Sequence, residues 1–263
     1  MAIPQPSRRL IMAVDMERYS RHDDAGQARV QTDFRDIMQR AAEQCGLERA
    51  CWEIQPTGDG ELALFPPGIS EPRIIADLVP AMDRVLHDHN RYVAPRAEVR
   101  LRVAIHQGLI TTTANGYAGS AVVTAARLVD ADPLKDALKR FPQAAVVVIV
   151  SSTIFREVVS QSYSGIRKER YGRVEVRVKS FAEDAWIFVP DEDFNLTGPP
   201  SSLARDTPPP GSPDQVPWLE PPATNGSSFS FGAVTNHGPT VFGDHARVVG
   251  NADPSRGDGT SWR

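Results

Sequence analysis

The apolar positions of the first 190 residues follow two kinds of repeat, each typical of one secondary structure. Three- and four-residue spacing predicts helices over residues 27–45, 71–90 and 119–140, because apolar side chains at that spacing share one helix face. A short helix is expected over residues 153–160, and Pro80 is expected to kink or split the helix around it. Alternating or short apolar runs predict strands over residues 8–15, 50–55, 61–65, 98–110, 144–151, 173–179 and 185–189.

This order of elements, β-α-β-β-α-β-α-β-α-β-β, predicts an α/β fold of the α+β sandwich type. We expect a ferredoxin-like split βαβ sheet with flanking helices over residues 8–190. The run over residues 144–151 is uniformly apolar, which is typical of a central strand buried on both faces. Residues 111–120 contain an Asn-Gly pair and are expected to form a turn or loop.

Composition narrows the functional classes. The net charge of −4 provides no global basic field for nucleic acid or an anionic membrane, so we expect neither as a partner. No apolar run is long enough to span a membrane, and residues 1–7 lack the apolar core of a signal peptide, so a cytoplasmic location is expected. Cys45 and Cys51 are interpreted as idle or buried thiols of a reducing compartment.

The sequence changes character after residue 190. Residues 191–227 are rich in Pro, Ser and Gly, which predicts a disordered linker, and a disordered tail is expected over residues 252–263. Between them, residues 228–251 form two β-prone stretches that favour a short cross-β module with Asn ladders. This segment resembles the amyloid signalling motifs at the ends of actinobacterial immune-type proteins, and the resemblance implies a protein partner bearing a like motif.

Two aspartates carry the strongest chemical signal. Asp15 closes the apolar run over residues 10–14, and Asp59 lies in a Thr-Gly-Asp-Gly turn over residues 57–60 that predicts a hairpin. Alone, Asp59 would be an ordinary turn residue. If the hairpin pairs beside the first strand, however, both carboxylates reach the same edge of the sheet. Oxygen-only clusters of this kind suit Mg²⁺ or Mn²⁺, which in turn hold phosphates.

Together with later motifs, the two aspartates resemble the catalytic domain of class III adenylate and guanylate cyclases, in a divergent form. The resemblance covers residues 8–189 and includes the Asp15 and Asp59 segments, the strand ending Ile105-His106-Gln107-Gly108, and the helix Val123-Thr124-Ala125-Ala126-Arg127-Leu128. It implies a phosphorus–oxygen lyase that converts a nucleoside triphosphate into a 3′,5′-cyclic nucleotide and pyrophosphate in intracellular signalling. In that family two Mg²⁺ or Mn²⁺ ions per site activate the ribose 3′-hydroxyl and neutralise the triphosphate.

The resemblance also implies roles for single residues. Asp15 and Asp59 would be the metal ligands, Arg127 would stabilise the transition state, and Lys179 would bind the leaving polyphosphate. The aspartates of one chain would work with the arginine of the other, so a homodimer is implied. Gln55 stands at the first base-reading position, and Asn115 lies beside the second, near Gly116. These residues leave the base open, as a purine or a pyrimidine.

One departure from the family pattern keeps a second function open. Val123 stands where the family has a transition-state asparagine, and loss of one such donor costs about two to three orders of magnitude in rate. Thr124 could compensate only in a shifted register. The alternative is a catalytically impaired cyclase-homology module that binds nucleotide or dimerises, with output through residues 228–251.

Overall fold

The computed structural model describes residues 5–114, 116–178 and 181–195. Most of the predicted linker, the β-prone stretch at 228–251 and the tail at 252–263 lie outside these residues, so those predictions stay untested. Within the described ranges, no helix combines the length and the apolar character needed to cross a membrane.

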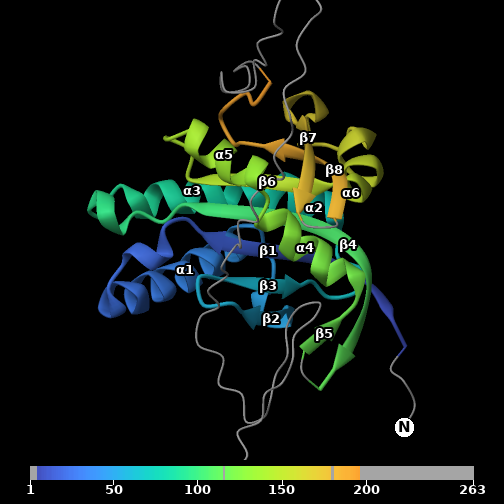
Figure 1. Cartoon of the computed structure of the whole chain (residues 1–263), viewed down its shortest axis with the longest axis horizontal. Helices are drawn as coiled ribbons and strands as arrows, with labels where there is room; N and C mark the ends of the chain where they lie inside the picture. Colours follow the sequence, from blue (N-terminus) through green and yellow to red (C-terminus); the bar gives the residue numbers. More distant parts are fainter. Residues whose placement is uncertain (1–4, 115, 179–180, 196–263) are drawn as a thin grey trace, which may run out of the picture. The chain divides into compact units, whose positions relative to one another are not determined.

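The described part is built on one eight-stranded sheet in the order β2-β3-β1-β4-β6-β8-β7, with β5 paired to β4 (Figure 1). The strands are β1 (Ser7–Met16), β2 (Glu53–Pro56), β3 (Gly60–Leu64), β4 (Leu101–Thr113), β5 (Gly116–Ala118), β6 (Val146–Ser151), β7 (Gly172–Val178) and β8 (Phe181–Phe188). The α-helices are α1 (Asp24–Gln44), α2 (Glu71–Arg73), α3 (Val79–Asn90), α4 (Ser120–Val129), α5 (Asp132–Arg140) and α6 (Ser152–Glu157).

The sheet is mixed, and β1 and β4 form its centre. β1 runs antiparallel to both β3 and β4, whereas β4 and β6 are parallel and are joined through α4 and α5. The uniformly apolar β6 is buried along its whole length, as predicted for a central strand. The predicted fold class, a split sheet with flanking helices, is therefore confirmed.

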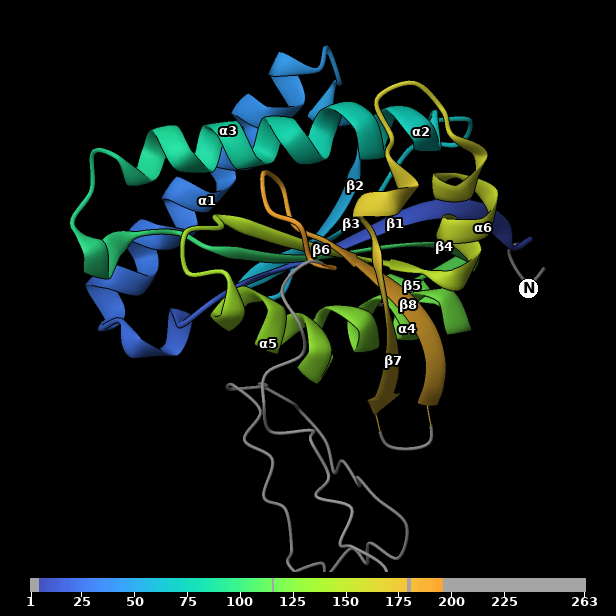
Figure 2. The same ribbon diagram turned by 90° about the horizontal axis from the view of Figure 1, so that it is seen from above.

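Two layers of helices cover the two faces of the sheet (Figure 2). The strict alternation of side chains along β1 sends successive residues to different cores. Leu10, Met12 and Val14 pack in the core that also contains side chains of α1, α3 and α6. Ile11 and Ala13 instead pack in the core formed with α4 and α5. Because Asp15 continues the second series, its side chain belongs to the α4 and α5 face.

Prolines interrupt two of the predicted helices; the interruption at Pro80 was expected, and the second was not. The helix over residues 71–90 contains a π turn, Ile74–Leu78, which directly precedes α3, and Pro80 lies in the first turn of α3. Proline has no backbone N–H to donate within a helix, so a wider turn is placed before it. The single helix predicted over residues 119–140 is wrong, because the chain breaks after Val129 and restarts as α5 with Pro133 in the first turn.

The turn or loop predicted over residues 111–120 is mostly a hairpin. β4 continues to Thr113, beyond the last residue paired with β1, and β5 folds back on it with Thr111 opposite Ala118. This β4–β5 arm extends past the neighbouring strands in Figure 1. The threonines and the tyrosine of the arm are residue types that favour strands, and the apolar periodicity is too short to predict it.

The predicted hairpin after residue 50 is present, and its second strand pairs with β1. Asp15 lies opposite Gly60, the first residue of β3. A Cβ atom on Gly60 would lie 1.9 Å from the carbonyl oxygen of Val14, so only glycine allows β3 to approach β1 this closely. Gly58 is needed in the same turn for a different reason. Its φ of +91° lies in the left-handed region, which favours glycine.

These two requirements predict different costs for the two glycines. Gly60→Ala should lower the free energy of unfolding by about 3 kcal/mol or more, because its new methyl group meets backbone atoms that cannot rotate away. Gly58→Ala has no such neighbour and should cost only about 1–2 kcal/mol for its backbone conformation. Urea unfolding measures both, with Gly68→Ala, another positive-φ glycine in open space, as the matched control. Equal losses at all three positions would contradict the close approach at Gly60.

Candidate active site

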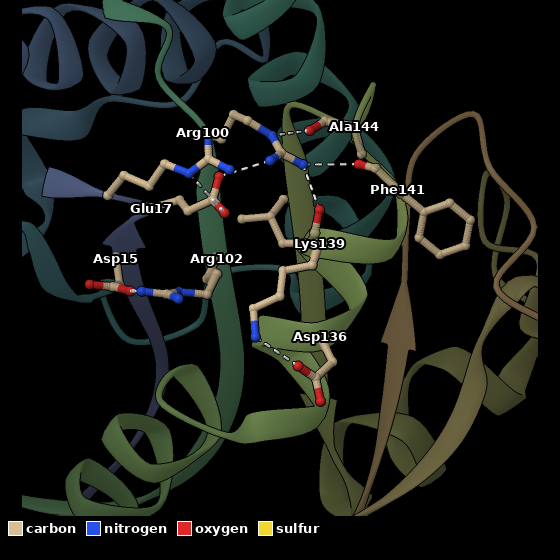
Figure 3. Close-up of polar contacts among 10 residues, drawn as sticks. Asp15, Glu17, Arg100, Arg102, Asp136, Lys139, Phe141 and Ala144 are labelled. Atoms are coloured by element: carbon tan, nitrogen blue, oxygen red, sulfur yellow. Dashed lines mark hydrogen bonds and ion pairs between the residues drawn. The ribbon is translucent and has the colours of Figure 1, made fainter. Parts of the chain in front are cut away.

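The first candidate residue, Asp15, lies at the end of β1 and faces Arg102 of β4, its paired neighbour (Figure 3). The Arg102 Nε atom donates to Asp15 Oδ2 at 2.7 Å, and Arg102 Nη2 donates to the same oxygen. The two side chains are only 19% and 16% exposed, so the pair lies at a partly desolvated edge of the sheet. Both donor bonds go to one oxygen, so the second oxygen of Asp15 has no share in this ion pair.

The second candidate, Asp59, is held beside Asp15 by its own backbone. The amide of Met16, directly after Asp15, donates to the Asp59 carbonyl at 2.8 Å. Gln31 of α1 donates from its side-chain amide to the Gly58 carbonyl at 2.7 Å, so the hairpin turn is fixed from two sides. A buried ion pair between Glu61 and Arg49, with Nη1 to Oε1 at 2.8 Å, anchors the strand just after the turn.

The two carboxylates lie close enough to interact electrostatically. Burial, with a smaller contribution from the Asp59 carboxylate, raises the pKa of Asp15 from 3.8 to about 6, against the opposing effect of the Arg102 charge. The structure therefore brings together the two acidic side chains that the sequence analysis expected at one edge of the sheet. Their role as metal ligands stays a prediction.

The donor set fits a hard divalent cation. It consists of carboxylate oxygens alone, and among the described residues no third Asp, Glu, His or Cys joins them in a metal-binding group. Mg²⁺ is commonly held by one or two carboxylates, with water and substrate phosphates in the remaining positions. A pair of this kind can therefore retain a cation firmly only when a phosphate-bearing molecule is also present.

The first residue predicted to read the base, Gln55, lies next to Gly116 of β5. Gln55 is exposed on β2, and its side-chain oxygen lies 3.1 Å from the position that a Cβ atom of Gly116 would occupy. The edge strand β2 and the start of β5 thus meet at this point. Asn115 lies outside the described residues, as does Lys179.

The α4 residues are placed elsewhere. Ala121, Ala125 and Leu128 are buried against the sheet, which leaves Val123 47% exposed and Thr124 half-buried. The guanidinium of Arg127 lies over the ring of Phe181 at the start of β8, with its carbon 5.3 Å from the ring centroid.

The strand register separates Arg127 from the acidic pair. Arg102 is level with Val147 of β6, whereas Phe181 lies beyond Ala185, the partner of Ser151 at the far end of β6. At about 3.3 Å per residue, this corresponds to roughly 25 Å along the strands. Within one chain, therefore, Arg127 does not reach Asp15 and Asp59.

The sequence analysis did not single out Arg102. The alternation that buries Leu101, Val103 and Ile105 puts Arg102 on the other face of β4, which is the face that carries Asp15. That alternation indicates which face of the sheet Arg102 is on, but only the register of β4 against β1 shows that Arg102 lies beside Asp15. Arg102 is the guanidinium that pairs directly with Asp15.

The fold matches that of solved nucleotide cyclase domains. A crystal structure of an adenylate/guanylate cyclase/hydrolase from Silicibacter pomeroyi superimposes with a TM-score of 0.52 and 22% sequence identity, over 72% of this chain and 99% of that chain. The chain thus has the fold of adenylate and guanylate cyclase catalytic domains.

More distant matches belong to the same class. A bacterial light-regulated adenylyl cyclase matches with a TM-score of 0.48 at 15% identity, over 73% of this chain and 95% of that chain. The catalytic core of a rhodopsin-guanylyl cyclase matches with a TM-score of 0.46 at 13% identity, over 70% and 96%. No protein-family model and no curated protein matches the sequence.

The surroundings of Asp15 predict a measurable titration. Its carboxyl group should titrate near pH 6, and Asp59→Asn should lower that pKa, because it removes a neighbouring negative charge. Carboxyl ¹³C NMR over pH 3–8 measures both, with the exposed Asp136→Asn as the control. An unchanged Asp15 pKa in Asp59→Asn would show that the carboxylates do not interact.

The sign of the linked stability follows from the raised pKa. The contribution of Asp15 to the free energy of unfolding is largest below about pH 3.8, where its carboxyl group is protonated in both the folded and the unfolded protein. As the pH rises through about 6, the carboxyl group ionises in the folded protein as well, and this stabilising contribution is lost. Relative to Asp15→Asn, the wild-type protein should therefore lose up to about 3 kcal/mol of stability between pH 4 and pH 7.

Proposed function

We propose that this protein is a nucleotide cyclase that forms a 3′,5′-cyclic nucleotide and pyrophosphate from a nucleoside triphosphate. The observation that carries the proposal is the juxtaposition of Asp15 and Asp59 at the end of β1, in a chain with the cyclase fold. The half-buried Arg102 beside them adds a positive group for phosphate oxygens. When bound, two Mg²⁺ or Mn²⁺ ions would activate the ribose 3′-hydroxyl and neutralise the triphosphate charge.

The residues of the chain have separate tasks in this reaction. Asp15 and Asp59 would hold the cations, and Arg102, which donates to Asp15 Oδ2, lies close enough to the pair to bind a phosphate oxygen. Gln55, against Gly116, contacts the base, and its amide can both donate and accept hydrogen bonds. Asn115, Thr124 and Lys179 remain candidates for substrate contacts.

The position of Arg127 supports a homodimer as the active unit. Because roughly 25 Å of sheet separates it from the acidic pair in one chain, a transition-state role for Arg127 requires the acidic pair of a second copy. Phe181 then serves to hold the guanidinium in place by stacking. Val123, exposed on the same helix, supplies no hydrogen bond to a nucleotide, so we expect slow turnover.

The direct test is turnover of ATP, GTP, CTP and UTP with Mn²⁺, with cyclic product detected by mass spectrometry. Asp59→Asn should reduce the rate by roughly two orders of magnitude or more, since even an outer-shell partner of a metal ligand is worth 10- to 100-fold. Asp136→Asn, an exposed aspartate paired with Lys139 on α5, is the matched control and should retain the wild-type rate. Folded protein that makes no cyclic product from any of the four nucleotides would refute the proposal.

A mixing experiment tests the shared site separately. Asp59→Asn and Arg127→Ala should each be inactive alone, because each variant lacks one half of every site. In an equal mixture, mixed dimers contain one intact site, so about a quarter of the wild-type activity should return. If the two residues act within one chain, the mixture will stay as inactive as its components.

A further inference from the structure

A cavity of about 760 Å³ lies at the end of the sheet where β1 ends and β4 begins. It is bordered by the segment between β1 and α1, the first turns of α1, and the segment just before β4. Neither Asp15, Asp59, Arg102 nor Gln55 lines it, so it is separate from the candidate active site. Its volume is within the range of sites for small molecules.

The lining of this cavity is strongly cationic in a chain whose net charge is −4. Five arginines line it: Arg18, Arg21, Arg29, Arg96 and Arg100. The acidic residues of the lining are fewer, namely Glu17, Asp23 and Glu98. The guanidinium groups come from three separate segments of the chain and converge on one space, so they form more than a local run of charge.

Most of the acidic groups of the cavity are already engaged. Glu17 accepts from Arg100 at 2.8 Å, and Arg100 also donates to the carbonyls of Leu138, Phe141 and Ala144 (Figure 3). Asp23 caps α1 by accepting from the Gly26 amide at 2.8 Å. Glu17 and Arg100 therefore satisfy each other in an ion pair, and the N-terminus of α1 is capped by Asp23.

The remaining arginines keep their binding capacity. Among the described residues, neither the Arg21 nor the Arg96 guanidinium forms an ion pair or a hydrogen bond. Arg18 and Arg29 have only loose carboxylate neighbours, at 3.7 Å and 3.9 Å. Several guanidinium forks without firm partners around one cavity match the geometry of phosphate oxygens, and their combined charge favours an anion that carries more than one negative charge.

We propose that this cavity, which we call the arginine cavity, binds a small molecule that carries two or more phosphate groups, independently of the acidic pair and without a divalent cation. The adjoining Glu17 follows Asp15 by two residues, and its backbone amide donates to the Arg100 carbonyl at 2.9 Å. A ligand held by Arg18 and Arg21 would thus fix the segment that leaves the Asp15 strand. The site is suited to regulation of the chain by a phosphorylated metabolite.

Calorimetric titration with inorganic triphosphate in the presence of EDTA tests the proposal, because chelation removes the cations on which the candidate active site would depend. We expect saturable binding that weakens at least about tenfold in Arg21→Gln/Arg96→Gln, since each substitution removes a charge-assisted donor. Binding should also weaken as salt is raised. Both substituted side chains are exposed, so the fold should be retained, and thermal unfolding checks this.

Two control variants separate this site from the others. Arg156→Gln/Arg167→Gln removes two exposed arginines outside the arginine cavity and should leave the affinity unchanged. Arg102→Gln should also leave it unchanged. Absence of binding to the wild-type chain, an equal loss in the Arg156 and Arg167 variant, or a loss in Arg102→Gln alone would each overturn the proposal. None of these results depends on whether the protein turns over a nucleotide.

Discussion

The candidate site depends on the close approach of β3 to the end of β1. Gly60 permits that approach, because any side chain there would collide with the carbonyl of Val14. The Met16 amide then binds the Asp59 carbonyl, and Gln31 of α1 holds the next carbonyl of the turn. The position of Asp59 is thus set by backbone hydrogen bonds, which makes it far more constrained than an aspartate in a free hairpin.

This constraint forces an unfavourable arrangement of charge. Two carboxylates share a partly buried edge, and a single guanidinium, Arg102, offsets them, so burial and the neighbouring charge together raise the pKa of Asp15 to about 6. Acidic pairs with a raised pKa are common at functional sites. The arrangement is therefore consistent with the metal-ligand role proposed for the two carboxylates.

The sequence was sufficient to predict the sheet and most of its helices, because these rest on local periodicity, whereas the meeting of the two aspartates was expected only if the hairpin pairs with β1. The break between α4 and α5 was missed although Pro133 is a local signal for it. Other features depend on tertiary contacts, such as the β4–β5 arm, which requires the pairing of Thr111 with Ala118. Arg102 could not be recognised because its importance comes from the register of β4 against β1. The arginine cavity joins segments about 70 residues apart in the chain, and no linear pattern records it.

For Arg127, too, the local sequence motif and the tertiary structure carry different information. Its sequence motif suggests catalysis, but the structure places it on Phe181, far from the acids of its own chain. In the proposed shared site, the two halves come from different chains, so an interaction that concentrates the chains would raise the number of complete sites. The predicted interaction motif at residues 228–251 would act on the proposed turnover in this way, by bringing two domains together.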